Sequence, residues 1–253
     1  MGGERVDRAE AVELIERAPL VELMARADAV RRRWNPTDDV TFVVDTNPNY
    51  TNVCVTDCTF CSFYRRPGHA EAYVLSPEAV GRKAAEAQAA GATTILLQGG
   101  HHPELTFDYY ASLATAIAEA APGLHRHLFS PPEIDHMSRI SDLDAAEVLR
   151  RLWALGLRTL PGGGAEILSD RVRRRVSPKK ISSDRWLEVM RLAHEAGFKT
   201  SATMTYGHLE TVEDIVEHLM CLRTLQDETG GFYAFIPWSF KPGVSALSRR
   251  VAA

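Results

Sequence analysis

From about residue 41 onward, short apolar or β-branched runs alternate with longer segments of helical spacing. Six runs are predicted to be strands: 41–47, 93–100, 124–131, 157–164, 199–207 and 231–240. They are almost continuously apolar, which is typical of parallel strands covered by helices. Because six uninterrupted units occur and no G-x-G-x-x-G follows the first strand, the sequence predicts a parallel (β/α) barrel rather than a doubly wound sheet.

Capping residues predict where several of the intervening helices begin. Ser76, Asp144, Ser183 and Thr211 each precede a segment of helical spacing, and a side-chain oxygen at such a position accepts a backbone N–H of the first turn. Residues 1–40 contain two further helical segments, 8–17 and 19–33, and are expected to form an N-terminal helical extension.

Residues 41–253 are expected to form the barrel domain. The sequence "KPGVSALSRRVAA" follows the sixth predicted strand. A closed eight-stranded barrel needs two more βα units, so the domain is expected to be a six-stranded partial barrel or to be incomplete at its C-terminal end.

Charge and hydropathy exclude several classes of partner. The net charge of the 253-residue chain is -4, which gives no reason to expect nucleic acid or an anionic membrane. No run approaches the roughly 18 apolar residues of a membrane span, and the charged N-terminal segment lacks the pattern of a secretory signal. We therefore expect a cytoplasmic protein, in which clustered cysteines are more often ligands or catalysts than disulfides.

Three of the four cysteines, Cys54, Cys58 and Cys61, fall within eight positions in the spacing C-x3-C-x2-C. Thiolates are soft ligands that suit zinc or an iron–sulfur cluster. A structural zinc site takes four protein ligands, and His69 could supply the fourth. A cubane cluster held by three cysteines instead leaves one iron open. A disulfide with a spare thiol, or inert buried cysteines, are the remaining alternatives.

The predicted strand ends carry polar residues and glycines. They are Asp45, Gln98-Gly99-Gly100, Ser130, Gly162 to Gly164, and Tyr206-Gly207. In a (β/α) barrel the C-terminal strand ends meet at one face, and that face holds the active site. The cysteine loop follows the first strand, so it is expected at the same face.

The segment Cys54-x3-Cys58-x-Phe60-Cys61 resembles the signature of radical S-adenosylmethionine (SAM) enzymes. The resemblance implies a [4Fe-4S] cluster held by these three cysteines, with SAM bound to the open iron through its amino and carboxylate groups. It further implies an electron donor such as flavodoxin or ferredoxin. Reductive cleavage of SAM would yield a 5′-deoxyadenosyl radical that takes hydrogen from a small-molecule substrate.

The resemblance also implies roles at the cofactor. Phe60 resembles the aromatic residue whose neighbouring backbone meets the SAM adenine, and Ser130 is a further cofactor-binding candidate. Gly99 and Gly100 match the glycine pair that receives the methionine amino group, although a simple βα turn also uses glycine. Glu166 is a candidate to bind the SAM ribose hydroxyls or the substrate. Alternatively, its carboxylate only stabilises the N-terminus of a helix.

The segment "TMTYGHLE" resembles the adenine motif of the fifth strand, which ends in G-x-x-E. Thr203 stands where that motif often has glycine. Met204 is a candidate adenine contact, although a buried methionine is more often a core residue. Tyr206, His208 and Glu166 are the catalytic candidates, and Tyr206 and His208 would contact polar groups of the substrate.

Two further features have simple explanations. The basic run Arg171, Arg173, Arg174 and Arg175 is interpreted as a solvated helix face, or as the source of one partner for a substrate carboxylate. Cys221 lies in a predicted helix away from the cysteine loop and is interpreted as a packed thiol.

Motifs from residue 5 to about 243 resemble the cyclic dehypoxanthinyl futalosine synthase family of menaquinone biosynthesis. They are "NYTNVC", "LLQGGHHPEL", "SPPEI", "PGGGAEILSDRVRRRVSPKK", "ATMTYGHLET" and "LQDETGGFYAFIPW". The resemblance implies dehypoxanthine futalosine as substrate, hydrogen abstraction from its ribose, and addition of the resulting radical to its benzoate ring. Aminofutalosine synthase and the deazaflavin-chromophore enzymes share most of these motifs, whereas Trp238 and "PGGGAEILSDRVR" favour the cyclase. A zinc- or cluster-stabilised SAM-binding module is the non-enzymatic alternative.

Overall fold

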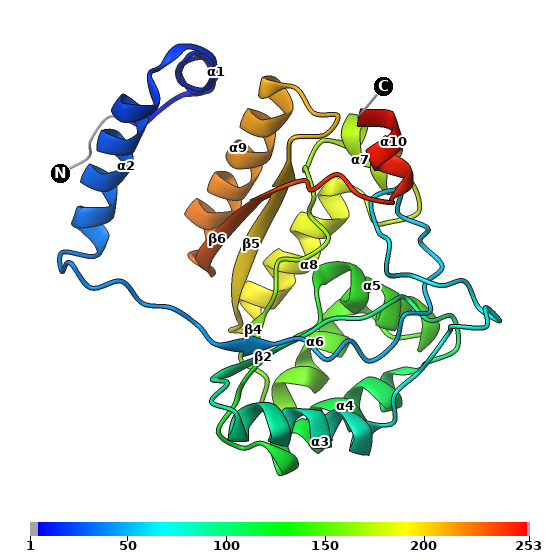
Figure 1. Ribbon diagram of the computed structural model, residues 1–253. Helices are drawn as coiled ribbons and strands as arrows, with labels where there is room; N and C mark the ends of the chain where they lie inside the picture. The colour runs from blue at the N-terminus through cyan, green and yellow to red at the C-terminus, as the bar shows by residue number, and fades with distance from the viewer. Residues whose placement is uncertain (1–4, 252–253) are drawn as a thin grey trace.

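The computed structural model describes residues 5–251, and six parallel strands form its central sheet (Figure 1). The strands pair in chain order. Their bounds are β1 (Asp45–Thr46), β2 (Thr94–Leu97), β3 (His125–Leu128), β4 (Thr159–Leu160), β5 (Lys199–Tyr206) and β6 (Phe232–Ser239). The sheet curls into a half-barrel, so the prediction of a parallel barrel with six visible βα units is confirmed.

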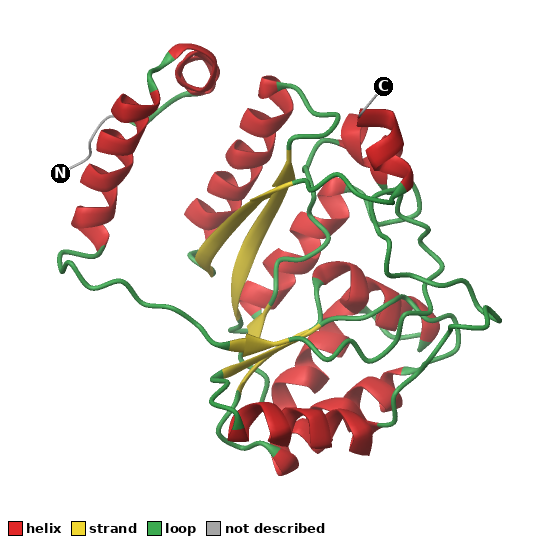
Figure 2. Ribbon diagram, in the orientation of Figure 1, coloured by secondary structure: helices red, strands yellow, loops and turns green. Residues whose placement is uncertain are grey.

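Helices cover the convex side of the curled sheet (Figure 2). They are α3 (Pro77–Ala89), α4 (Phe107–Ala120), α5 (Pro131–Ile140), α6 (Ala145–Ala154), α7 (Asp170–Val176), α8 (Ser183–Glu195) and α9 (Val212–Thr229), and α10 (Ala246–Val251) follows β6. Ser76, Asp144 and Thr211 cap α3, α6 and α9 as predicted. The predicted cap Ser183 is wrong by one residue, because the Ser182 side chain accepts the hydrogen bond from the Arg185 amide.

Strand β5 shows how the sheet separates its two faces. Ala202 packs against Trp186 of α8, whereas Ser201 hydrogen-bonds to His127 of β3. Since side chains alternate along a strand, Thr203 and Thr205 face the concave side with Ser201, and Met204 faces the helices with Ala202. The apolar core therefore lies between sheet and helices, and the concave side is left to polar residues.

The first predicted strand, 41–47, is wrong in extent. Only Asp45–Thr46 pairs with β2, while Phe42 and Val43 remain 84% and 63% exposed. Among residues 5–251, no further strand lies beside β1 on its other edge. β-Branched residues favour an extended chain, but a ladder also needs a partner strand.

The two predicted N-terminal helices are present as α1 (Arg8–Arg17) and α2 (Leu20–Trp34). Helix α1 packs against α9, and Arg8 forms an ion pair with Glu217. Helix α2 buries no residue and stands away from the sheet in Figure 1. The division of the chain at residues 40 and 41 stays a prediction.

In the part of the chain from residue 5 to residue 251, no helix combines the length and apolar character needed to cross a membrane.

Candidate active site at the cysteine loop

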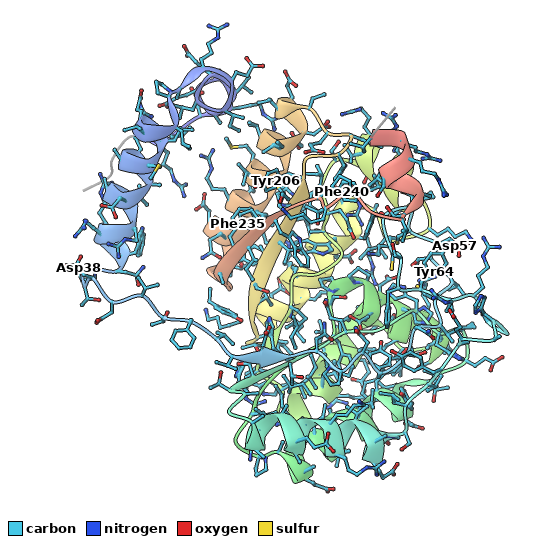
Figure 3. All side chains as sticks on the ribbon, in the orientation of Figure 1. Asp38, Asp57, Tyr64, Tyr206, Phe235 and Phe240 are labelled. Carbon is cyan, nitrogen blue, oxygen red and sulfur yellow. The ribbon has the colours of Figure 1, made fainter. Side chains whose placement is uncertain are left out.

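A cavity of about 870 Å³, counted with its open mouth, lies at the C-terminal ends of the strands. The loops after β1, β2, β3 and β4 form its walls, and the end of β6 contributes Trp238. Tyr64, labelled in Figure 3, lines it from the cysteine-loop side. The cavity is thus where the polar strand ends were expected to meet.

The cavity contains the side chains of all three clustered cysteines. Cys54 and Cys58 are buried and Cys61 is partly exposed. The Thr56 hydroxyl lies between the two buried sulfurs, 2.9 Å from Cys54 Sγ and 3.6 Å from Cys58 Sγ. Burial raises the pKa of the Cys58 thiol, and the nearby Lys180 ammonium opposes that rise. The three clustered cysteines therefore line one cavity.

The glycine pair after β2 lets the cysteine loop cross the strand end closely. A Cβ on Gly100 would lie 2.2 Å from the Val53 carbonyl oxygen, and one on Gly99 would lie 2.5 Å from the Tyr50 ring. The Gly100 amide also donates a hydrogen bond of 3.0 Å to the Thr51 carbonyl. Any side chain at Gly100 would displace the loop. Both glycines line the cavity, and their role as a cofactor-binding pair stays a prediction.

Glu133 of α5 links the loops that follow β1, β2 and β3. It was not singled out from the sequence. Its Oε1 accepts hydrogen bonds from the Tyr50 hydroxyl at 2.8 Å and the Gly99 amide at 3.1 Å. Its Oε2 accepts from the Ser130 amide and hydroxyl. Burial raises the pKa of Glu133, although these hydrogen bonds oppose the rise. The capping pattern in "SPPEI" was the sequence signal that could have located it.

Glu166 forms the centre of a buried ionic group. Lys180 Nζ lies 2.8 Å from Glu166 Oε1, and Arg173 Nη1 lies 3.6 Å from Glu166 Oε2. Burial alone would raise the pKa of Glu166, but the two cations outweigh it and hold the pKa below its usual value. Glu166 Oε2 has no hydrogen-bond partner among residues 5–251. This carboxylate therefore retains an acceptor at the cavity wall.

Lys180 was not singled out from the sequence, where it is one of two adjacent lysines. Its side chain is 14% exposed, lines the cavity, and lies over the Phe60 ring at 5.3 Å. Burial opposes its charge, but Glu166 and Cys58 raise the pKa of Lys180 above its usual value. A buried cation thus faces the same space as the three thiols.

The interpretation of the basic run as a solvated helix face is wrong for Arg173. This side chain is 3% exposed, and its guanidinium donates to the Gly164, Ala165 and Ile181 carbonyl oxygens. It thereby holds the loop that carries Glu166, which adopts a positive φ of 44°. The exposed residues Arg174 and Arg175 do fit the predicted solvated face.

Three predicted site residues do not line the cavity. Met204 packs against Ile167 and Leu247 in an apolar cluster, and its role as an adenine contact stays a prediction. Tyr206, labelled in Figure 3, is 38% exposed at the strand end. The His208 ring hydrogen-bonds locally, to the Thr205 carbonyl at 3.0 Å and the Leu209 amide at 2.7 Å. Neither Tyr206 nor His208 therefore lies at the cavity wall, where a contact with the substrate would be made.

The donor set suits a cluster better than a single zinc ion. His69 is exposed, and its Nδ1 accepts a hydrogen bond from the Glu71 amide outside the cavity. Among residues 5–251, no three His, Cys, Asp or Glu side chains gather closely enough to hold one metal ion. Zinc would need its sulfurs about 2.3 Å from one centre. A cubane binds its cysteines on separate irons, so it does not need three ligands around one centre.

Sequence comparison gives the family directly. The radical SAM superfamily profile matches residues 48–222. The chain is 45% identical over 216 residues to 5-amino-6-(D-ribitylamino)uracil–L-tyrosine 4-hydroxyphenyl transferase of Methanopyrus kandleri, covering 85% of this chain and 58% of the relative. It is 43% identical over 242 residues to cyclic dehypoxanthine futalosine synthase of Halalkalibacterium halodurans, covering 96% and 65%. Aminodeoxyfutalosine synthase of Thermus thermophilus is 41% identical over 251 residues, covering 99% and 67%.

Solved structures show the same fold. Methylornithine synthase superposes with a TM-score of 0.73 at 15% identity, covering 97% of this chain and 68% of that one. The FeFe-hydrogenase maturase HydG from Carboxydothermus hydrogenoformans gives a TM-score of 0.74 at 20% identity, covering 96% and 55%.

The chain spans about three fifths of the length of the first two curated relatives. The profile nevertheless covers the cysteine loop and every strand from β2 to β5, and members of this family use a [4Fe-4S] cluster and SAM. The chain belongs to the radical SAM superfamily.

Proposed function

We propose that this chain is the radical SAM part of a cyclic dehypoxanthine futalosine synthase. The observation that carries the proposal is the 43% identity to such an enzyme over 96% of the chain, from the N-terminal helices to the strand that bears Trp238. The transferase relative is as similar in identity, but its match covers 85% of the chain. The position of Trp238 in the cavity supports a role near the substrate.

Cys54, Cys58 and Cys61 would hold the cluster, since all three thiols face one cavity. The cluster and SAM, when bound, supply a 5′-deoxyadenosyl radical that removes a hydrogen atom from the substrate. Lys180 offers a buried cation for the SAM carboxylate, and Glu166 offers an acceptor for the ribose hydroxyls. Glu166 Oε2 has no hydrogen-bond partner among residues 5–251, so it can accept a hydroxyl while Oε1 keeps its contact with Lys180.

The remaining residues of the site would hold the substrate and exclude water. Trp238 provides an aromatic surface on the concave side of β6, where a benzoate ring can stack. The cyclisation needs the ribose radical held against that ring, so positioning is the main contribution of the protein. The hydrogen atom leaves in 5′-deoxyadenosine, and the cyclised radical then loses a proton to solvent and an electron to a one-electron acceptor such as an oxidised iron–sulfur centre. The product is therefore lighter by two hydrogens.

The test uses the anaerobically reconstituted chain with SAM and dithionite. Dehypoxanthine futalosine should increase the release of 5′-deoxyadenosine and give a product two hydrogens lighter by mass spectrometry. Because the chain spans 65% of the cyclase relative, release of 5′-deoxyadenosine in response to substrate is the first readout and product formation the second. A substrate that changes neither would contradict the proposal.

Aminodeoxyfutalosine synthase is the second candidate, because that relative matches 99% of the chain at 41% identity. It predicts that an enolpyruvyl benzoate, and not dehypoxanthine futalosine, stimulates SAM consumption, with transfer of the adenosyl group and loss of carbon dioxide. The mass of the product distinguishes adenosyl transfer from oxidation by two hydrogens. Parallel incubation with L-tyrosine and 5-amino-6-(D-ribitylamino)uracil tests the transferase activity named for the Methanopyrus kandleri relative.

A further inference from the structure

Four exposed arginines, which we call the basic face, lie on two neighbouring helices. They are Arg174 and Arg175 of α7 and Arg249 and Arg250 of α10. Figure 1 shows the two helices side by side, and Arg250 Nη1 donates a hydrogen bond to the Arg175 carbonyl. Among residues 5–251, none of the four forms an ion pair. The chain as a whole carries a net charge of -4, so the basic face opposes the overall charge.

Both helices are attached to the cysteine loop at one residue. The Thr59 amide donates to the Val176 carbonyl at the end of α7 at 2.8 Å, and its hydroxyl donates to the same oxygen at 3.0 Å. The Leu247 amide in α10 donates to the Thr59 carbonyl at 2.8 Å. Thr59 directly follows Cys58 in the chain. Helices α7 and α10 are therefore each one hydrogen bond away from the residue that follows a proposed cluster ligand.

An acidic residue of the cysteine loop, two positions before Thr59, is paired with two cations. Asp57, labelled in Figure 3, lies 2.6 Å from Lys179 Nζ and 3.2 Å from Arg66 Nη2. Both cations lie within ion-pair distance, so this carboxylate is already paired. Its charge does not cancel the four arginines.

We propose that the basic face is the docking surface of an acidic one-electron carrier protein. The inference rests on the proposed function, because each SAM cleavage at the cysteine loop takes one electron from outside the chain. One electron leaves the carrier, which is oxidised by one unit, and enters the cluster, which is reduced by one unit; no bond forms or breaks. Complementary charge speeds the encounter of two proteins and fixes their relative orientation. A carrier bound to this face would lie against the two helices that hydrogen-bond to Thr59, the residue after Cys58.

The experiment measures cluster reduction by stopped-flow absorbance on the reconstituted holoprotein, with a fully reduced acidic flavodoxin as the probe. The Arg174→Glu/Arg175→Glu variant should be reduced at least 10-fold more slowly at low ionic strength, and Arg249→Glu/Arg250→Glu should behave similarly. Raising the salt concentration should slow the wild type and leave the variants little changed. The matched control is Arg82→Glu/Lys83→Glu, an equal charge reversal on exposed residues of α3.

A reduced cationic viologen serves as a second reductant, because a small cation does not need the basic face. It should reduce the wild type and every variant at rates within twofold of each other. Wild-type rates with flavodoxin in both arginine variants would overturn the proposal. So would equal slowing by the viologen, since this would show a damaged cluster site. The neutral variant Arg174→Gln/Arg175→Gln should show a smaller slowing if charge is the cause.

These rates do not depend on which substrate the enzyme takes. If the chain fails to cyclise dehypoxanthine futalosine but is reduced more slowly after charge reversal, the docking surface stands and the proposed reaction does not. If cyclisation occurs but charge reversal leaves flavodoxin reduction unchanged, the reaction stands and the docking surface does not.

Discussion

Replacing Lys180 by methionine tests the buried ionic group that lines the proposed SAM site. The substitution removes the cation 2.8 Å from Glu166 Oε1 and leaves a carboxylate that is 6% exposed. Removing one partner of a buried ion pair costs about 3–5 kcal/mol, because the other charge is left without compensation. Arg173 remains 3.6 Å from Glu166 Oε2, so we expect the lower end of that range.

The signs of the pKa shifts define the pH window of this effect. The pKa of Glu166 is lowered in the folded chain, so its contribution to stability is present above about pH 4.3 and is lost as the pH falls through the folded value. The pKa of Lys180 is raised, so its contribution is present below about pH 10.4 and is lost as the pH rises through the folded value. The difference between wild type and variant should therefore be largest between these limits.

The assay is denaturant unfolding followed by circular dichroism, at pH 7 and at pH 3.5. Lys180→Met should lose about 3 kcal/mol at pH 7, and the loss should shrink at pH 3.5 as Glu166 becomes protonated. Glu166→Gln/Lys180→Met should be more stable than Lys180→Met alone, because it removes the uncompensated charge. Wild-type stability of Lys180→Met at pH 7, or a loss independent of pH, would refute the reasoning.

Three further predictions concern the cysteine loop and the edge strand. Gly100→Ala should lower stability by about 1–3 kcal/mol and reduce the iron content after reconstitution, because its Cβ would lie 2.2 Å from a carbonyl oxygen; Gly243→Ala, with open space around it, should do neither. Thr56→Val should shift the cluster reduction potential to a more negative value in an EPR-monitored titration, whereas Thr56→Ser should not, since hydroxyl donors stabilise the reduced cluster. Ile236→Lys should reduce concentration-dependent self-association measured by light scattering, because Ile236 is 48% exposed on the edge strand; an equal decrease from Val244→Lys, which lies off the strand, would argue against the edge as the cause.

The fold could be predicted because its signal is repeated and local. Six apolar runs, each followed by helical spacing, specify a parallel sheet whatever the details of packing. Strand length was predicted less well, since β1 and β4 each contain two residues where longer strands were expected. Extended residues count as a strand only where a neighbour supplies hydrogen bonds, and the sequence of one segment does not reveal its neighbour.

In the candidate site, too, the residues with a local sequence signal could be predicted, and those that depend on the folded structure could not. Cys54 and Cys58 could be singled out because the spacing of the cysteines is visible in the sequence, and Gly100 because a glycine pair ends a predicted strand. Lys180 was missed because burial turns an ordinary surface residue into a site residue, and burial depends on how the loop after α7 folds back. Whether Met204 would line the cavity could not be predicted, because one residue of register decides which face of a strand a side chain occupies.

The central claim is that the cysteine loop supports radical SAM chemistry. The most direct test is mass-spectrometric detection of 5′-deoxyadenosine after anaerobic reconstitution with iron and sulfide and addition of SAM and dithionite. The wild type and Cys221→Ala should bind about four irons per chain and release 5′-deoxyadenosine, because Cys221 lies in α9 beside Glu217. Cys54→Ala, Cys58→Ala and Cys61→Ala should do neither. A wild-type protein that binds zinc but forms no cluster, or that binds SAM with its cluster reduced and never cleaves it, would contradict the account.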